Sequence, residues 1–357
     1  MIDLKKQNVL FFARTMGLGG TENVILQLCE VFKPFVNKIV VCSSGGVNEE
    51  KLKAMGIKHY TIGDPIDKSL NNVIRSSKAL KKIVADENIT LIHTHHRMAA
   101  FYVRFTGLYK KCSFVNTSHN TFYDKKRLTR YAYKHAALIA CGEMVKKNLT
   151  DFYGLENVSV VHNAVKAFED KIKPCEILVK ARNEGKFLIG NVGRLSEQKG
   201  MEYFIKAVPS VIKEHPDTEF FIVGTGEDEL KLNAMAKGLP VTFLGYRTDV
   251  QNIMSQLDLV VLSSLWEGLP LTPIEAFSVG KTIIATSVDG TPEVVDDNVN
   301  GLLIDPKDPD AIADRINYMI SYPDKKHQME INAKKTFDER FSFDIFAQKY
   351  IDFYRSL

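Results

Sequence analysis

The sequence has no apolar run of 18 or more residues, the minimum length for a helix that spans a membrane. Its first residues, MIDLKKQNVLFFA, contain no apolar core followed by a small-residue cleavage site, so we expect no secretory signal. Its five cysteines are scattered and include no Cys-x-x-Cys pair, which argues against disulfides and structural zinc. These absences predict a protein of the reducing cytoplasm.

Complete signatures for common cofactors are also missing. Gly224 and Gly226 follow an expected strand, but the third glycine of the G-x-G-x-x-G fingerprint is absent, which disfavours a dinucleotide oxidoreductase. His93, His95 and His96 could form a zinc site near a strand end, but no acidic or cysteine partner is close in sequence. We therefore expect no metal and no bound cofactor.

Charge is unevenly distributed over the 357 residues, although the net charge is only +4. Residues 1–180 contain 28 lysines and arginines against 16 aspartates and glutamates, whereas residues 181–357 contain 19 against 27. Together with the length, this split predicts two domains with different partners. A basic half is suited to an anionic membrane surface or to a phosphate-bearing substrate.

Short apolar or β-branched runs alternate with helical patterns, which is typical of parallel sheets covered by helices. The runs of the first half are 8–13, 38–43, 90–95, 113–118, 137–141 and 158–163. The runs of the second half are 187–193, 219–226, 241–246, 257–264, 281–287 and 301–306. The polar segment 168–186 breaks this rhythm and predicts a linker.

This organisation predicts an α/β protein with two Rossmann-like, doubly wound domains and an interdomain cleft that binds the ligand. We place the domains at residues 1–175 and 176–335. The remaining residues, 336–357, predict a helix that packs back on the first domain through an aromatic stripe. The stripe consists of Phe343, Phe346, Tyr350 and Tyr354.

Two cations follow the first strand of the second domain, in the segment GNVGRLSEQKG. Gly193 allows the chain to turn, so Arg194 and Lys199 are expected on a loop at the carboxyl end of that strand. Arginine binds a diphosphate through its planar fork and lysine as a compact charge, and neither requires a metal. Two solvated loop cations would show the same pattern.

Two carboxylates, Glu267 and Glu275, stand eight positions apart in LWEGLPLTPIEAF. We expect Glu267 on a loop and Glu275 early in a helix, with the turn Gly268-Leu269-Pro270 exposing backbone N–H groups near the helix start. Carboxylates on either side of such a turn can hold the hydroxyl groups of one polyol ligand. Glu275 alone could instead compensate the helix dipole.

A further strand end carries Tyr246, Arg247 and Asp249, whose loop could contact a nucleotide base. Asp249 could also cap the next helix. The D-x-D at 308–310 follows a strand and opens a helix, and we interpret it as a cap and not as a metal motif.

In this order, the motifs resemble glycosyltransferase family 4, whose members are retaining transferases with the GT-B fold. The similar segments are GRLSEQKG and EGLPLTPIE in the second half, and MGLGGTENVILQL, LIHTHH and NTSHN in the first. The resemblance covers nearly the whole chain. It implies that the second domain binds most of a nucleotide-sugar donor.

The resemblance also implies roles for single residues. Arg194 and Lys199 would bind the donor diphosphate, Glu275 the ribose hydroxyls, and Glu267 the donor sugar, while His119 would lie beside the transferring sugar. The catalytic candidates are His119, Glu267, Arg194 and Lys199. The donor-binding candidates are Gly19, Gly20, Gly193, Arg194, Lys199, Gly224, Tyr246, Arg247, Glu267, Gly268, Leu269, Pro270 and Glu275.

A basic stretch, 123–137, follows His119. Lys126, Arg130 and Lys134 repeat every four residues and would share one helical face, with aromatic residues between them. Such a face can contact anionic lipid, although an ordinary solvated helix fits equally well. With His95, these cations are our candidates for the acceptor or membrane side.

The expected function is transfer of a hexosyl or N-acetylhexosaminyl group from a UDP-sugar to a saccharide or lipid-linked saccharide in bacterial surface polysaccharide synthesis. The protein would be cytoplasmic or peripheral at the inner face of the plasma membrane, with no nucleic-acid partner. The main alternative is a UDP-N-acetylglucosamine epimerase or hydrolase with the same fold. The base, the sugar and the acceptor stay open.

Overall fold

The computed structural model describes residues 2–169 and 171–357, which form two compact units. The first unit contains the residues up to Asn163 together with Phe346–Leu357, and the second is Ala164–Ile345. This division lies earlier in the chain than the predicted boundary between 175 and 176, and the return to the first unit begins at 346, where 336 was expected. Residue 170, in the predicted linker, lies outside the described residues.

The first unit is built on seven parallel strands in the order β3-β2-β1-β4-β5-β6-β7. Six strands fall in the predicted runs, because strands buried on both faces have continuous apolar sequences. The edge strand β3 was not predicted, since its residues are polar and at most half-buried. The strands are β1 Asn8–Phe12, β2 Lys38–Ser43, β3 Lys58–Thr61, β4 Leu91–Thr94, β5 Ser113–Ser118, β6 Ala137–Ala140 and β7 Val158–Val160.

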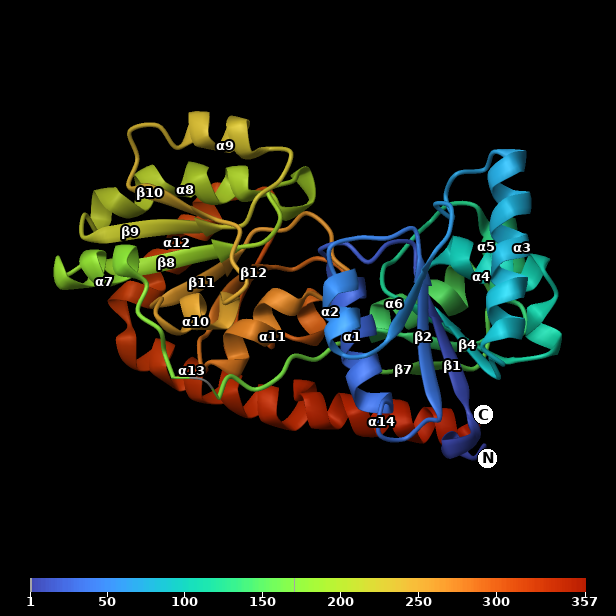
Figure 1. Cartoon of the computed structure of the whole chain (residues 1–357). Helices are drawn as coiled ribbons and strands as arrows, with labels where there is room; N and C mark the ends of the chain where they lie inside the picture. Colours follow the sequence, from blue (N-terminus) through green and yellow to red (C-terminus); the bar gives the residue numbers. More distant parts are fainter. Residues whose placement is uncertain (1, 170) are drawn as a thin grey trace. The chain divides into compact units, whose positions relative to one another are not determined.

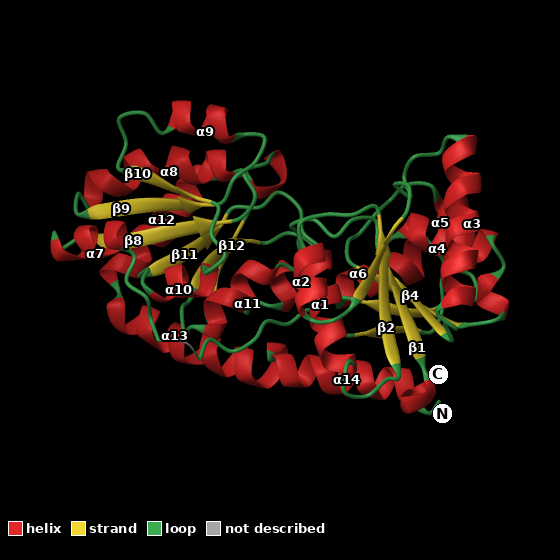
Figure 2. Ribbon diagram, in the orientation of Figure 1, coloured by secondary structure: helices red, strands yellow, loops and turns green. Residues whose placement is uncertain are grey.

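Helices cover both faces of this sheet. Figures 1 and 2 show α1 on one side of the strands and α3, α4 and α5 on the other. Right-handed crossovers produce this arrangement when the strand order reverses between β1 and β4. The helices between the strands are α1 Gly20–Phe32, α2 Glu49–Ala54, α3 Leu70–Asp86, α4 Arg97–Phe105, α5 Lys126–Tyr133 and α6 Glu143–Lys147.

The second unit has six parallel strands in the order β10-β9-β8-β11-β12-β13. All six overlap the predicted runs. Two parallel sheets with alternating helices confirm the predicted doubly wound fold class. The strands are β8 Phe187–Val192, β9 Thr218–Val223, β10 Val241–Gly245, β11 Leu259–Leu262, β12 Ile283–Thr286 and β13 Gly301–Ile304.

The helices of the second unit include one that we did not predict. Helix α7 occupies part of the expected linker and buries Leu178 and Ala181, too few positions to show a helical period in the sequence. Asp308 caps α12, as interpreted, by accepting from the N–H of Ala311 at 2.9 Å. The helices are α7 Glu176–Asn183, α8 Met201–Glu214, α9 Glu229–Met235, α10 Val250–Ser255, α11 Leu271–Ser278, α12 Pro309–Ser321 and α13 Pro323–Thr336.

The last helix, α14 Phe343–Ser356, contributes aromatic side chains to the core of the first unit. Tyr354 stacks on Phe32 with ring centroids 4.1 Å apart, and its hydroxyl lies 2.8 Å from Nδ1 of His93. The hydroxyl of Tyr350 lies 3.2 Å from Oγ1 of Thr117. These buried hydroxyls fix the helix against the strands that end at the site described below.

Membrane crossing by a helix can be judged from length and composition. Over the described ranges of the chain, we find no helix that combines the length and the apolar character needed to cross a bilayer.

Candidate active site

In each unit, the carboxyl ends of the parallel strands lie at one edge of the sheet, so the loops that follow them gather there. In the second unit, these loops carry Lys199 after β8 and Glu267 after β11. Lys199 Nζ lies 2.6 Å from Glu267 Oε1, and the two side chains are only 18% and 7% exposed. Both residues were predicted for the site, but their ion pair was not.

Glu267 is held by further contacts. The Ser264 hydroxyl donates to Oε1 at 2.6 Å, and the backbone N–H of Glu267 donates to Asp289 Oδ2 at 2.8 Å. Gly193 leaves room for the lysine, because a Cβ at 193 would approach the carbons of the Lys199 side chain to 3.3 Å. A buried pair with these additional hydrogen bonds is preorganised before any ligand binds.

Arg194 lies on the same loop as Lys199 but in a different environment. Its side chain is 71% exposed, and Nε donates to Glu227 Oε2 at 3.1 Å. Exposed ion pairs contribute little to stability, so a phosphate could replace Glu227 at small cost. Arg194 is therefore available to an anion, whereas Lys199 is already held.

Glu275 is the fifth residue of α11, whose first residue is Leu271. The carboxyl is half-buried, and this burial raises its pKa to about 7, while the charge of Lys199 acts in the opposite direction. Within the described part of the chain, no side chain or backbone group hydrogen-bonds to the Glu275 carboxylate. Because the dipole effect is confined to the first turn, dipole compensation does not account for this residue.

The turn Gly268-Leu269-Pro270 is buried, contrary to the expectation of an exposed backbone. Gly290 packs against it so closely that a Cβ at 290 would lie 2.0 Å from the Gly268 carbonyl oxygen. Helix α11 begins directly after Pro270, and the first N–H groups of a helix have no partner within the helix. The donors that this segment offers a ligand are those of the helix start.

The remaining donor-binding candidates of the second unit differ in role. Gly224 has φ of 138°, and a Cβ there would lie 1.9 Å from the Gly193 carbonyl oxygen, so this glycine lets two loops touch. Tyr246 is exposed. Arg247 binds Asp249 with two hydrogen bonds of 2.8 and 2.7 Å. Asp249 is the N-cap residue of α10, as the alternative interpretation expected, but its carboxylate binds Arg247 and makes no capping hydrogen bond to the helix.

In the first unit, the strand ends carry histidines. His95 follows β4 and His119 follows β5, and His95 Nδ1 lies 3.0 Å from His119 Nε2. Burial lowers the pKa of both rings. Interactions with His93 and His119 add to the decrease for His95, and an interaction with His96 adds to that for His119, whose pKa is about 4. Both rings are therefore neutral at pH 7.

The third histidine of this group, His93, belongs to the core. Its Nδ1 lies 2.8 Å from the Tyr354 hydroxyl, and its Nε2 lies 2.8 Å from Oγ1 of Thr117. Both nitrogens are thus engaged, and His93 is not available as a metal ligand. In the part of the chain that the structure describes, no cluster of three histidine, cysteine, aspartate or glutamate side chains is arranged to hold a metal ion.

Gly19 and Gly20 lie where α1 begins, at the carboxyl end of β1. Both are exposed, and Gly19 is the N-cap residue with no side chain to satisfy the first N–H groups of the helix. Glu22 lies in the first turn and accepts from the Thr15 hydroxyl at 2.6 Å. The predicted role of the two glycines as backbone donors is compatible with this position.

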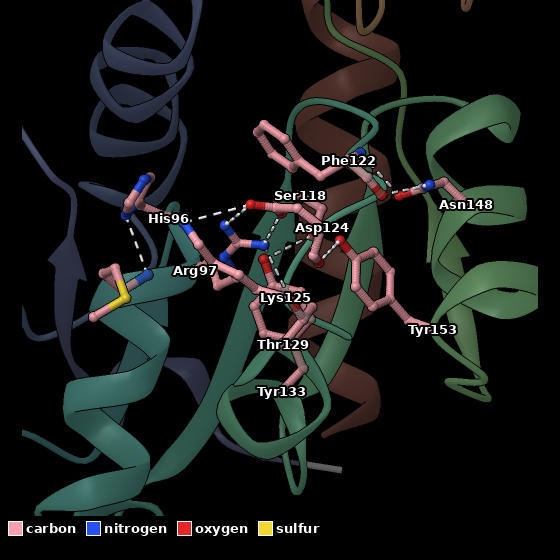
Figure 3. Close-up of polar contacts among 11 residues, drawn as sticks. His96, Arg97, Ser118, Phe122, Asp124, Lys125, Thr129, Tyr133, Asn148 and Tyr153 are labelled. Carbon is pink, nitrogen blue, oxygen red and sulfur yellow. Dashed lines mark hydrogen bonds and ion pairs between the residues drawn. The ribbon is translucent and has the colours of Figure 1, made fainter. Parts of the chain in front are cut away.

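The loop between β5 and α5 is pinned by residues that the sequence analysis did not identify (Figure 3). Asn148 binds both backbone groups of Phe122, donating to the carbonyl at 2.9 Å and accepting from the N–H at 3.2 Å. Tyr153 donates to the Asp124 carbonyl at 3.0 Å, and Arg97 pairs with the Asp124 carboxylate at 2.7 and 3.4 Å. No sequence motif marks these residues, because they come from separate segments.

The basic stretch is only partly helical. Lys126 and Arg130 are exposed on α5, but this helix ends at Tyr133, and Lys134 is the non-helical C-cap residue in the turn that follows. The predicted single helical face of three cations is therefore wrong for Lys134. The buried Tyr133 and the left-handed His135 (φ of 75°) turn the chain into β6 at this point.

Comparison with known proteins bears on both units. Residues 18–167 match the family model described as Glycosyltransferase Family 4, and residues 176–336 match the model described as Glycosyl transferases group 1. The chain belongs to the family 4 glycosyltransferases. The two matched segments of this glycosyltransferase contain every candidate residue described above.

Individual relatives agree with this assignment. The Escherichia coli UDP-Gal:alpha-D-GlcNAc-diphosphoundecaprenol alpha-1,3-galactosyltransferase is 28% identical over 87% of this chain and 86% of its own length. An uncharacterized glycosyltransferase of Methanocaldococcus jannaschii is 27% identical over 62% of this chain, which spans only 60% of that relative. The solved structure of Anabaena HepE in complex with UDP has a TM-score of 0.84 at 21% identity, over 98% of this chain and 100% of that one, and shows the same fold.

Proposed function

We propose that this glycosyltransferase transfers a hexosyl or N-acetylhexosaminyl group from a UDP-sugar to a saccharide or lipid-linked saccharide, with retention of the anomeric configuration and without a metal. The observation that carries the proposal is the buried Lys199–Glu267 pair, 2.6 Å apart, at the carboxyl edge of the second sheet. The charge of Lys199 also acts on Glu275, and Arg194 lies on the same loop as Lys199, where it pairs with Glu227. These contacts support a site that uses all four predicted residues.

The residue types suit a diphosphate leaving group. When the bond between the anomeric carbon and the phosphate oxygen breaks, its electron pair leaves with the nucleoside diphosphate. Lys199 and Arg194 would stabilise this charge, with a contribution of roughly 3 kcal/mol for one well-placed donor. Glu275 would accept the ribose hydroxyls, and Glu267 would hold Lys199 and face the donor sugar.

Retention would follow from attack on the same face of the sugar. The acceptor hydroxyl forms the new bond to the anomeric carbon from the side on which the diphosphate leaves. The departing phosphate oxygen takes the hydroxyl proton, so no carboxylate base is needed. His119 would orient the transferring sugar.

The choice of UDP and of a lipid-linked acceptor rests on relatives. HepE was crystallised with UDP, and the E. coli relative is named for UDP-Gal and a diphosphoundecaprenol-linked sugar. The exposed cations Lys126, Arg130 and Lys134 would favour an acceptor at an anionic membrane surface, at the inner face of the plasma membrane.

A binding panel tests the nucleotide. UDP should raise the melting temperature of the full chain more than GDP does, and NAD should leave it unchanged. UDP-sugars are then compared for turnover with and without added saccharide acceptors, in buffer with a chelator. Loss of turnover in the chelator would overturn the metal-independent mechanism.

The products separate transfer from the alternative function. A transferase yields UDP and an acceptor glycoside whose anomeric coupling in proton NMR matches that of the donor. An epimerase or hydrolase consumes UDP-N-acetylglucosamine with no acceptor present, and that result would reject the proposal. Inverted coupling in the product would reject the retaining step alone.

A further inference from the structure

The ring-to-ring hydrogen bond between His95 and His119 constrains where their protons lie. His95 Nδ1 and His119 Nε2 are 3.0 Å apart, and the two rings lie nearly parallel, at 19°. Both rings are neutral at pH 7, so each carries one proton on one of its two nitrogens. Of the two facing nitrogens, one must donate and the other must accept, which leaves two arrangements.

The far nitrogen of His95 distinguishes these arrangements. His95 is 4% exposed, and its Nε2 is buried without a hydrogen-bond partner in the described residues. If His95 accepted from His119, its own proton would occupy Nε2 as a buried N–H with no acceptor. If His95 donates, Nε2 is only an unpaired acceptor. Among buried backbone groups, donors without a partner are rarer than acceptors without one, and we apply the same preference to the imidazole ring.

His93 does not alter this choice. The His93 ring is 4.2 Å from the His95 ring, centroid to centroid, but both of its nitrogens bind hydroxyl groups, of Tyr354 and Thr117. A hydroxyl can donate or accept, so His93 imposes no proton position on its neighbour. The unpartnered Nε2 of His95 is the asymmetric feature of the group.

The proton of His119 follows from that of His95. With its Nε2 accepting from His95, a neutral His119 carries its proton on Nδ1. The His119 ring is partly exposed, and no described residue hydrogen-bonds to Nδ1. We propose that His95 is a positioning residue that holds His119 in the Nδ1–H form, so that His119 donates a hydrogen bond to a substrate oxygen and does not act as a base there.

The consequence for substrate recognition rests on the proposed function, whereas the proton positions do not. An Nδ1–H group binds an oxygen lone pair, of a sugar hydroxyl or of a phosphate. Because Nδ1 of His119 has no lone pair, it cannot take the proton of the acceptor hydroxyl, and that proton goes to the departing phosphate. A general-base role for Nδ1 of this histidine is therefore excluded from the transfer step.

Nitrogen NMR of the full-length protein tests the proton positions without substrate. In a two-bond proton–nitrogen correlation spectrum at pH 7.5, the His119 signals are assigned by their loss in His119→Asn. We expect Nδ1 of His119 to be protonated and Nε2 to be unprotonated. The reverse pattern would overturn the proposal.

Substitutions of His95 test whether this residue determines which nitrogen of His119 is protonated. His95→Asn can place an amide N–H near the position of Nδ1 and should keep the His119 pattern, whereas His95→Phe should allow protonation at Nε2. His96→Asn is the matched control: it retains an N-cap for α4, removes no hydrogen bond to His119, and should leave the pattern unchanged. An unchanged pattern in His95→Phe would contradict the proposal, and melting temperatures show whether each variant is folded.

Turnover provides a separate measurement. Loss of one oriented hydrogen bond should lower kcat about 3- to 10-fold in His95→Phe, with restoration in His95→Asn. Equal kcat in the wild type and His95→Phe would reject the positioning role even if the NMR pattern held. If the wild type transfers no sugar, the proposed function fails, while the proton positions are still decided by the NMR experiment.

Discussion

At the carboxyl edge of the first sheet, His95 and His119 are neutral and bind each other, whereas at the corresponding edge of the second sheet Lys199 and Glu267 form a buried ion pair. Both sheets are parallel and doubly wound, so the same topology brings loops to one edge in each case. The difference lies in the side chains on these loops. The first edge offers polar neutral groups, and the second offers preorganised charge.

The candidate diphosphate site is cationic, although the half of the chain that contains it has a net negative charge. The cations of this site are Arg194 and Lys199. The basic half carries the neutral histidine pair at its strand ends. Net charge describes the long-range field of a domain, whereas a site is set by a few groups with fixed partners. Four changes test this contrast.

The largest effect is expected for Lys199. Lys199→Met should lower kcat about 100-fold or more, because the charge opposite the leaving diphosphate is lost. It should also destabilise the second unit, because Glu267 is left as a buried charge without its partner. The double variant Lys199→Met/Glu267→Gln should regain much of the stability but no activity. Lys231→Ala, which removes an exposed lysine paired with Glu202, is the control and should change neither. If Lys199→Met kept a kcat close to that of the wild type, the charge at the edge of the second sheet would not be needed for transfer.

Substitution of Glu275 should affect nucleotide binding and protein stability in opposite directions. Its pKa of about 7 is higher than in an unfolded chain, so the carboxyl contributes stability at low pH that is lost as pH rises from about 4.5 through 7. Glu275→Gln should therefore raise the melting temperature at pH 8 but not at pH 4.5, while UDP affinity falls about tenfold. Calorimetry and thermal unfolding measure the two effects, with the exposed Glu214→Gln as control. Stabilisation that is equal at both pH values would contradict the assigned pKa.

The contribution of His96, in the first unit, to stability should depend on pH in the opposite direction. Burial and the charges of Arg14 and Arg97 lower the pKa of His96 to about 4, although Asp64 acts the other way. The unfolded chain therefore binds more protons, and the contribution of His96, about 1–3 kcal/mol, is lost as pH falls from 6.5 to 4. In urea unfolding, His96→Asn should reduce this acid sensitivity, and the exposed His327→Asn should not. Identical pH profiles for all three proteins would count against the buried neutral state.

The smallest effect is expected for the surface cations of the first unit. The triple change of Lys126, Arg130 and Lys134 to alanine should weaken sedimentation with anionic vesicles at low salt severalfold and leave turnover of a water-soluble acceptor unchanged. Alanines at Lys78, Lys81 and Lys82, exposed on α3, provide a control with the same loss of charge. Equal loss in both triple variants would mean that net charge and not this surface attracts lipid.

Several contacts of the site could not be predicted from the sequence. The motifs named Lys199, Glu267 and Glu275, but not the pairing of the first two or the burial of the third. Arg247 and Asp249 are two positions apart, yet their ion pair replaced the expected cap because both side chains lie on the same side of the loop. The role of Asn148 at the backbone of Phe122 has no sequence signal, because any polar residue at that spacing would look the same.

The sequence by itself determined the alternation of strands and helices and the positions of the site loops. Continuous apolar runs form buried parallel strands, and glycines with charged residues directly after them mark carboxyl ends. Only the tertiary structure decided that β3 joins the edge of the first sheet, that the return to the first unit begins at Phe346, and that His95 faces His119. These outcomes depend on which atoms meet after folding, and burial then sets the proton and charge states of the groups that do.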